Sequence, residues 1–169
     1  MQHMGRLIFL FVLIQLVASC SSKKEEGVVV SDATLFSLAR TVSSFTYFKK
    51  SLDTLPAAGN SPHGGFVRVR FNQRAISAMN DSVNRLSKTF FPDESLIVKE
   101  VYAASGGPLT EYAVMYKIPG AANSGSGWIW AEYLPDGTAE YSAIKKGALC
   151  VSCHSASGNY DLVQIFRFH

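Results

Sequence analysis

The feature that most constrains the fold is a series of short, strand-like segments in the second half of the sequence, separated by turns that contain glycine or proline. Short strands joined by such turns pair with their neighbours as antiparallel hairpins. We therefore expect an antiparallel sheet at the centre of the fold. The four segments cover residues 95–103, 109–118, 127–133 and 139–144.

Helical patterns precede these strands. Ser31 or Asp32 is expected to cap a helix that runs to about Lys50, because apolar residues recur there at helical spacing. Asn72 is expected to cap a second helix that ends near Leu86. Helices followed by clustered strands indicate an α+β class, here a mainly antiparallel β-sheet with flanking helices.

The size and charge of the chain limit its class. A sequence of 169 residues is long enough to bury one core, and residues 31–169 are expected to form a single domain that includes a strand at 66–71. The formal net charge of +3 is spread along the chain without a basic cluster. Such a distribution is typical of a solvated surface, so no nucleic-acid partner is expected.

The first nineteen residues have the pattern of a signal peptide. Met1–Arg6 provides positive charge, and residues 7–19 are almost wholly apolar. A membrane-spanning helix needs about 20 apolar residues, which is more than this run contains. A short apolar run after a positive start is typical of a secretory signal that is later removed. The sequence therefore predicts export.

The end of this segment indicates a lipid anchor. Small residues directly precede Cys20 and resemble a bacterial lipobox, which implies cleavage before Cys20 and its acylation. Two or more acyl chains anchor a protein stably in a membrane. Residues 21–27 are polar and charged, and residues 20–30 would form a flexible tether. The chain would then be a membrane-anchored lipoprotein of the bacterial cell envelope, on the periplasmic side or at the surface. An ordinary signal peptide that contains a cysteine is the alternative.

The motif Cys150-Val151-Ser152-Cys153-His154 is C-x-x-C-H, the attachment signature of c-type haem. Two thiols three positions apart lie on one side of a helical turn and can add to the two vinyl groups of one haem. His154, the next residue, then supplies an imidazole ligand to the iron. Haem c is attached outside the bacterial cytoplasm, so one covalent haem c agrees with the predicted export.

Other interpretations of this motif exist. A C-x-x-C pair also forms disulfides or thioredoxin-like redox sites, although no βαβ pattern surrounds Cys150. Half of a zinc site is a further alternative. A closed zinc site needs four ligands, and His63 and His169 are the distant candidates for the remaining two.

The order of several segments resembles the cytochrome P-460 family. The segments are residues 91–100, which end in Val-Lys-Glu, then 127–130, the C-x-x-C-H motif at 150–154, and 161–163 behind it. The resemblance runs from about Phe66 to the C-terminus. It implies a mainly antiparallel β domain with a few helices, often a homodimer, and a c haem with one face open to a small ligand.

The resemblance also implies site residues. In the members that oxidise hydroxylamine, a lysine is joined covalently to the haem ring, and it resembles Lys99 here. A carboxylate in those members lies above the iron, and its position falls near Ala113 in this chain. Glu111 lies two residues earlier, on the same face of a regular strand, and is the candidate acid. A surface acid and a lysine that extends to water are the alternatives.

Two functions follow as hypotheses. The first is a haem protein that binds or oxidises small nitrogenous ligands such as hydroxylamine or nitric oxide and passes electrons to a redox partner protein. The second is an electron-transfer or gas-binding cytochrome without turnover, as in the related cytochrome c′-beta branch. Met79 or Met115 as a sixth iron ligand would favour the second.

Overall fold

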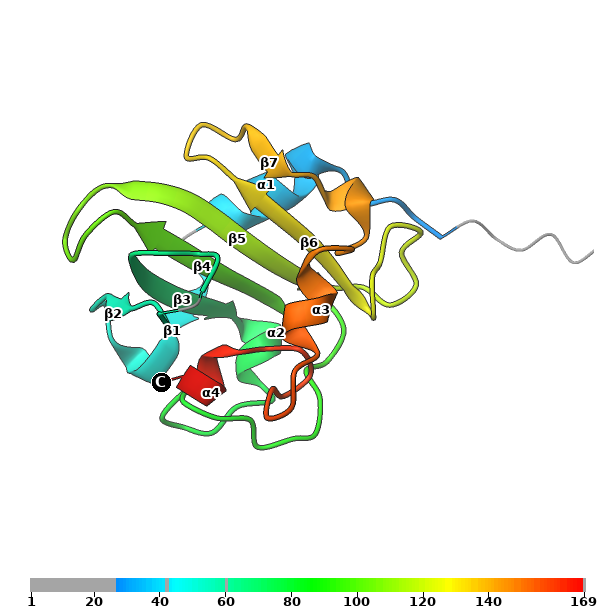
Figure 1. Ribbon diagram of the computed structural model, residues 1–169. Helices are drawn as coiled ribbons and strands as arrows, with labels where there is room; N and C mark the ends of the chain where they lie inside the picture. The colour runs from blue at the N-terminus through cyan, green and yellow to red at the C-terminus, as the bar shows by residue number, and fades with distance from the viewer. Residues whose placement is uncertain (1–26, 42, 60, 169) are drawn as a thin grey trace, which may run out of the picture.

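A computed structural model describes residues 27–41, 43–59 and 61–168, and its centre is a seven-stranded antiparallel sheet (Figure 1). The strand order is β1-β3-β4-β5-β6-β7, and β2 pairs with β3. The α+β class with a mainly antiparallel sheet is therefore confirmed. The strands are β1 (Phe45–Tyr47), β2 (Leu55–Pro56), β3 (Phe66–Asn72), β4 (Leu96–Tyr102), β5 (Leu109–Lys117), β6 (Trp128–Tyr133) and β7 (Ala139–Tyr141). The helices are α1 (Asp32–Arg40), η1 (Phe48–Lys50), α2 (Gln73–Ile76), η2 (Ala143–Lys145), α3 (Cys150–His154) and α4 (Ile165–Phe168).

The sheet buries both of its faces. On one face, Val98 and Ile129 pack with Leu35 of α1 in one hydrophobic cluster. On the other, Ile97 packs in a second cluster with Ile165 of α4. Figure 1 shows α1 behind the sheet and α2, α3 and α4 in front of it. Side chains alternate between these faces along each strand, so the strands determine which residues meet the front helices.

Buried ion pairs connect β3 and β4 on the α1 side. Arg70 is fully buried, and its Nε lies 2.8 Å from Glu100 Oε1. Arg68 Nε lies 2.7 Å from the other oxygen of Glu100. Paired charges avoid the high cost of a lone buried charge. Because Glu100 points to the α1 side, Lys99 points to the opposite side.

The first helix is shorter than the sequence predicts. It begins at Asp32 with Ser31 as N-cap, as expected, but it ends at Arg40 instead of continuing to Lys50. Phe45–Tyr47 instead pairs with β3. Serine and β-branched threonine are weak helix formers, and the open edge of β3 offers the backbone a full set of hydrogen bonds.

The second predicted helix is also shorter. Asn72 caps it as expected and accepts from the Ala75 N–H at 3.0 Å, but α2 ends at Ile76 rather than near Leu86. The Asn80 side chain accepts from the backbone N–H groups of residues 84 and 85. Asparagine side chains compete with helical hydrogen bonds in this way, so the segment forms turns.

The predicted signal peptide, Cys20 and the first part of the tether lie outside the described residues, which begin at Gly27. Within the described part of the chain, none of the helices has both the length and the apolar composition required to cross a bilayer.

Candidate functional site

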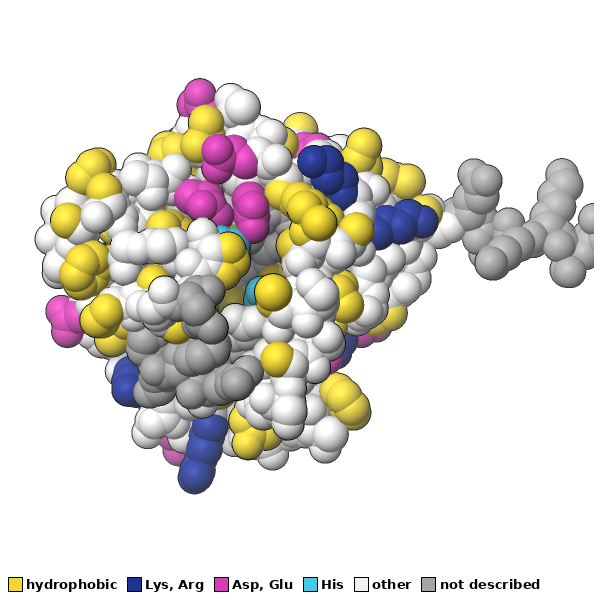
Figure 2. All heavy atoms as spheres, in the orientation of Figure 1, with side chains coloured by type: hydrophobic (Ala, Val, Ile, Leu, Met, Phe, Trp, Pro, Cys, Tyr) yellow, Lys and Arg dark blue, Asp and Glu magenta, His cyan; other side chains and the backbone are white. Residues whose placement is uncertain are grey.

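A pocket opens on the front face of the sheet, between β4, β5 and β6 on one side and α3 with the chain leading to α4 on the other. Its empty volume is about 520 Å³, which includes open space at the mouth. Figure 2 shows the hollow, with histidine inside and acidic side chains at its rim. Its lining combines aliphatic and aromatic side chains with a few polar groups, among them His63, Lys99, Glu132 and His154.

The two cysteines lie on α3, at the edge of this pocket. Both thiols are free; Cys150 is half-buried and lines the pocket, and Cys153 is exposed. Burial raises the pKa of the Cys150 thiol to about 11, and the nearby Glu132 and Cys153 add to the rise. Within the described residues, neither cysteine joins a group of three or more metal-ligating side chains. The free thiols do not favour the disulfide interpretation, whereas the zinc interpretation includes His169, which lies outside the described residues.

Gly147 brings α3 close to the sheet. Its φ is +64°, a left-handed conformation that favours glycine, and a Cβ atom here would lie 2.2 Å from the Trp130 ring. The chain can therefore turn closely over β6 before Cys150.

His154 has the environment of a metal ligand. Its Nδ1 lies 2.6 Å from the carbonyl oxygen of Leu162. A carbonyl only accepts hydrogen bonds, so Nδ1 donates and Nε2 keeps its lone pair. Burial lowers the pKa of His154 to about 4, so the ring is neutral at physiological pH. Its ring meets Trp130 edge to face, with centroids 4.8 Å apart.

A buried ion pair holds the segment that supplies the Leu162 carbonyl. Lys117 Nζ lies 2.5 Å from Asp161 Oδ2, and both side chains are about nine-tenths buried. The same oxygen accepts from the Phe91 N–H at 2.8 Å. Asp161 and Leu162 both have positive φ, 49° and 68°. The ion pair thus stabilises an unusual turn that directs a carbonyl at His154.

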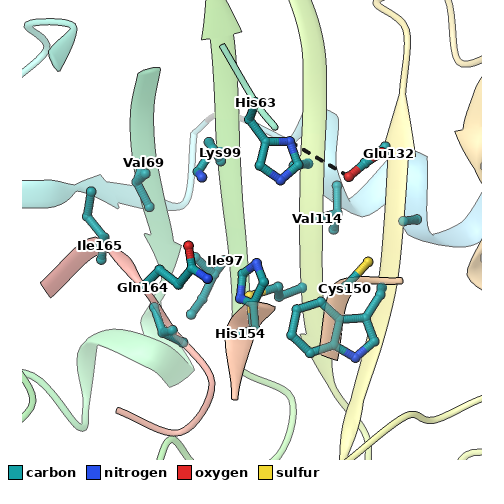
Figure 3. Close-up of a pocket in the computed structure, with 15 residues that line it drawn as sticks. His63, Val69, Ile97, Lys99, Val114, Glu132, Cys150, His154, Gln164 and Ile165 are labelled. Carbon is teal, nitrogen blue, oxygen red and sulfur yellow. Dashed lines mark ion pairs between the residues drawn. The ribbon is translucent and has the colours of Figure 1, made fainter. Parts of the chain in front are cut away.

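The wall opposite His154 contains a row of residues from three neighbouring strands. Lys99 of β4 pairs with Ala113 of β5, and Ala113 pairs with Glu132 of β6. All three line the pocket, and Figure 3 shows Lys99 and Glu132 on the far side from His154. Burial lowers the pKa of Lys99, partly offset by Glu111 and Glu132, and burial raises the pKa of Glu132. The small Ala113 side chain leaves room between them.

Glu111, the acid expected from the sequence, does not itself line the pocket but contacts His63, which does. Its Oε1 lies 3.1 Å from His63 Nδ1. Glu132 is the pocket carboxylate that sequence reasoning missed. The signal was available: Glu132 is two residues beyond Trp130, so it shares the strand face assigned to aromatic wall residues. His63 gave no such signal, because it lies in a loop that only the fold brings over the pocket.

Of the two methionines considered as iron ligands, Met115 lines the pocket, whereas Met79 packs in the core without lining it.

The residues present fit a c-type haem. Two free thiols and a neutral imidazole with a free Nε2 lie at one side of an apolar pocket, and the lining supplies a low-dielectric surrounding. Metal-binding histidines typically donate a hydrogen bond from the ring nitrogen that does not bind the metal, as His154 does to the Leu162 carbonyl.

Comparisons with known proteins agree with this arrangement. No curated protein matches the chain. Residues 47–165 match the family Cytochrome P460, and this segment contains strands β2 to β7, the pocket lining and the C-x-x-C-H motif. Because the match covers well over half of the chain, the protein belongs to the Cytochrome P460 family and is a haem protein.

Proposed function

We propose that the protein oxidises a small nitrogenous substrate of the hydroxylamine class at a single covalent haem c, held by Cys150, Cys153 and His154. The observation that carries this proposal is the opposition of His154 to Lys99 and Glu132 across one pocket (Figure 3). A substrate that is oxidised with loss of protons needs a metal to take its electrons and a nearby group to accept its protons. The pocket offers a metal ligand on one wall and proton-accepting groups on the other.

The attachment step uses the two thiols of α3. Each S–H adds across one vinyl C=C bond, so that a thioether forms and no atom is lost. The Cys150 thiol stays protonated at neutral pH because its pKa is about 11. When bound, the haem iron supplies a binding position for the substrate nitrogen and accepts electrons that an external redox partner then removes.

Glu132 is the proposed proton acceptor. Burial raises the pKa of its carboxyl above the usual value of 4.5, which brings it closer to the operating pH, where a general base is most effective. It lies on the neighbouring strand, beside Ala113 in the row where family resemblance places an acid. His63 lies next to Glu132, with 3.7 Å between Nδ1 and Oε1, and offers the next position for the proton.

Lys99 is the proposed contact to the edge of the haem ring. Within the described residues, its ammonium group forms no ion pair within 4.0 Å. Burial favours its uncharged amine, and an uncharged amine has a free lone pair. The covalent link implied by the family resemblance is part of this proposal: a bond from the Lys99 nitrogen to a ring carbon would replace one N–H and one C–H bond, with the two protons going to solvent and the two electrons to an external electron acceptor.

The proposed location is the cell envelope, with a lipid anchor on Cys20. The requirement for haem attachment outside the cytoplasm supports it, together with the signal pattern of residues 1–19. Membrane fractionation of wild type and Cys20→Ala tests the anchor. Retention of the variant in the membrane fraction would contradict it.

The test of the reaction uses the haem-loaded protein with hydroxylamine and an artificial electron acceptor. We expect steady turnover, a decrease of about 100-fold in Glu132→Gln, and little change in Asp81→Asn, whose carboxylate is exposed and outside the pocket lining. No turnover in wild type, despite full haem loading, would contradict the proposal.

A second candidate is an electron-transfer or gas-binding cytochrome without turnover. The presence of Met115 in the pocket lining favours it, because a thioether is a common sixth ligand of c haem. The absorption spectrum of the resting protein distinguishes the two: a six-coordinate iron whose sixth ligand is lost in Met115→Leu supports the second function.

A further inference from the structure

Three side chains from distant parts of the sequence meet at the rim of the pocket. They are His63 from the loop before β3, Glu111 from β5 and Glu132 from β6. One ligand atom from each lies within 4.8 Å of the others. Across residues 27–41, 43–59 and 61–168, no other group of histidine, cysteine or acidic side chains meets this description.

The spacing of these atoms suits a small metal ion. His63 Nδ1 lies 3.1 Å from Glu111 Oε1 and 3.7 Å from Glu132 Oε1. Zinc bonds to nitrogen and oxygen of roughly 2.0–2.1 Å place neighbouring ligands of a tetrahedron about 3.3 Å apart. The two distances from His63 lie on either side of this value, and the two carboxylates lie within 4.8 Å of each other, so side-chain adjustment would be needed to close the site around an ion.

The charges also favour a cation. Glu111 and Glu132 are both largely shielded from solvent, with side-chain exposures of 18 % and 29 %. Among the described residues, His63 is the sole basic group within 4.0 Å of either carboxylate. Two carboxylates in this setting repel each other, and a divalent ion between them would leave the group neutral overall.

We infer that His63, Glu111 and Glu132 form a binding site for one divalent transition-metal ion of the zinc class, on the pocket wall that faces His154. The metal takes the position on Nδ1 that the hydrogen bond to Glu111 occupies, and the neutral imidazole keeps its one proton on Nε2. One imidazole with two carboxylates selects zinc, cobalt or manganese over calcium, which prefers six or more oxygen ligands. Three protein ligands leave a fourth position open.

Metal binding has a consequence that rests on the proposed function. Glu132 bound to a metal cannot accept a proton from substrate, so zinc and turnover compete for the same carboxylate. The binding itself does not depend on this role and is tested without turnover.

The test measures zinc bound to the untagged, haem-loaded protein after treatment with a chelator. Equilibrium dialysis against zinc, followed by elemental analysis, gives the ratio of zinc to haem iron. We expect one zinc per iron in wild type, an affinity lower by at least about tenfold in His63→Ala and Glu111→Gln, and no change in Asp81→Asn, whose exposed carboxylate lies outside the site. Equal binding by wild type and His63→Ala, or no binding by wild type, would overturn the inference.

Thermal unfolding provides a second measurement that guards against misfolded variants. A ligand that binds the folded state raises Tm, so zinc should raise Tm in wild type and Asp81→Asn but not in His63→Ala. If the protein does not bind zinc, it can still oxidise hydroxylamine, and if it does not oxidise hydroxylamine, it can still bind zinc. The two experiments therefore test the two proposals separately.

Discussion

The Nδ1 atom of His154 donates a hydrogen bond to the Leu162 carbonyl oxygen across 2.6 Å. This contact fixes the tautomer and orientation of the imidazole, leaving Nε2 free to bind iron. The Leu162 carbonyl in turn depends on the neighbouring Lys117–Asp161 ion pair. The proximal side of the site is therefore built from two segments far apart in the sequence.

Removing Lys117 should destabilise the fold. Lys117→Met leaves the buried Asp161 carboxylate without its cation, and such a change costs about 3 kcal/mol. The exposed pair Arg74–Glu94 is the matched control, because its Nε–Oε2 distance is 3.8 Å and both side chains are more than half exposed. Arg74→Met should cost less than about 1 kcal/mol. Urea unfolding of both variants measures the difference, and equal losses would argue against a role for the ion pair.

Gly147 should tolerate no side chain. Gly147→Ala combines positive φ with a steric conflict against Trp130, which would push α3 off the sheet and reduce covalent haem attachment. Gly106 is the matched control: its φ is +70°, and a Cβ there has no atom within 4 Å. Gly106→Ala should lower the free energy of unfolding by only about 1–2 kcal/mol, the cost of a left-handed backbone for a residue with a Cβ atom. This variant should keep full haem loading. The haem-to-protein ratio of each purified variant is the measurement, and full loading of Gly147→Ala would refute this account.

The prediction for Glu132 concerns stability as a function of pH. Burial raises the pKa of this carboxyl in the folded state above 4.5. The protonated carboxyl therefore makes its full contribution to stability at pH values below the pKa of the unfolded state. This contribution is lost as the pH rises through the pKa of the folded state. Glu132→Gln should therefore gain stability relative to wild type at about pH 7 and show little difference near pH 4. Urea titrations at both pH values test this, and a difference that does not change with pH would count against the raised pKa.

Lys99 should affect the haem spectrum. If its amine is joined to the ring, the reduced wild-type protein has a Soret band well to the red of ordinary c haem, and Lys99→Met restores an ordinary band. The matched comparison is Lys145→Met, since Lys145 lies in η2, outside the pocket lining, and its variant should keep the wild-type spectrum. Identical spectra for wild type and Lys99→Met would exclude the link.

Much of the fold was predictable because the central strands have clear alternation and clear turns. β4, β5 and β6 lie within one residue or so of the predicted segments, and Ser31 and Asn72 cap helices as expected. The helix lengths were not predictable. Pairing of Phe45–Tyr47 with β3 and the local hydrogen bonds of Asn80 depend on contacts that helical spacing does not encode.

Some residues of the site were likewise predictable from the sequence, and others were not. The pocket lining contains Cys150, His154 and Lys99, which motif and resemblance had singled out. Glu132 required the β5–β6 register, which aligns it with Ala113. His63 required the path of a loop between two strands, and no spacing in the sequence predicts that path.

The most direct test of the account is whether haem stays on the unfolded chain. The protein is expressed with its signal and the haem c maturation machinery, denatured, and separated by electrophoresis before staining for haem. We predict that haem remains with the wild-type chain and is lost from the Cys150→Ala/Cys153→Ala double variant. A wild-type chain that releases its haem on denaturation, or never contains any, would contradict covalent attachment at Cys150 and Cys153.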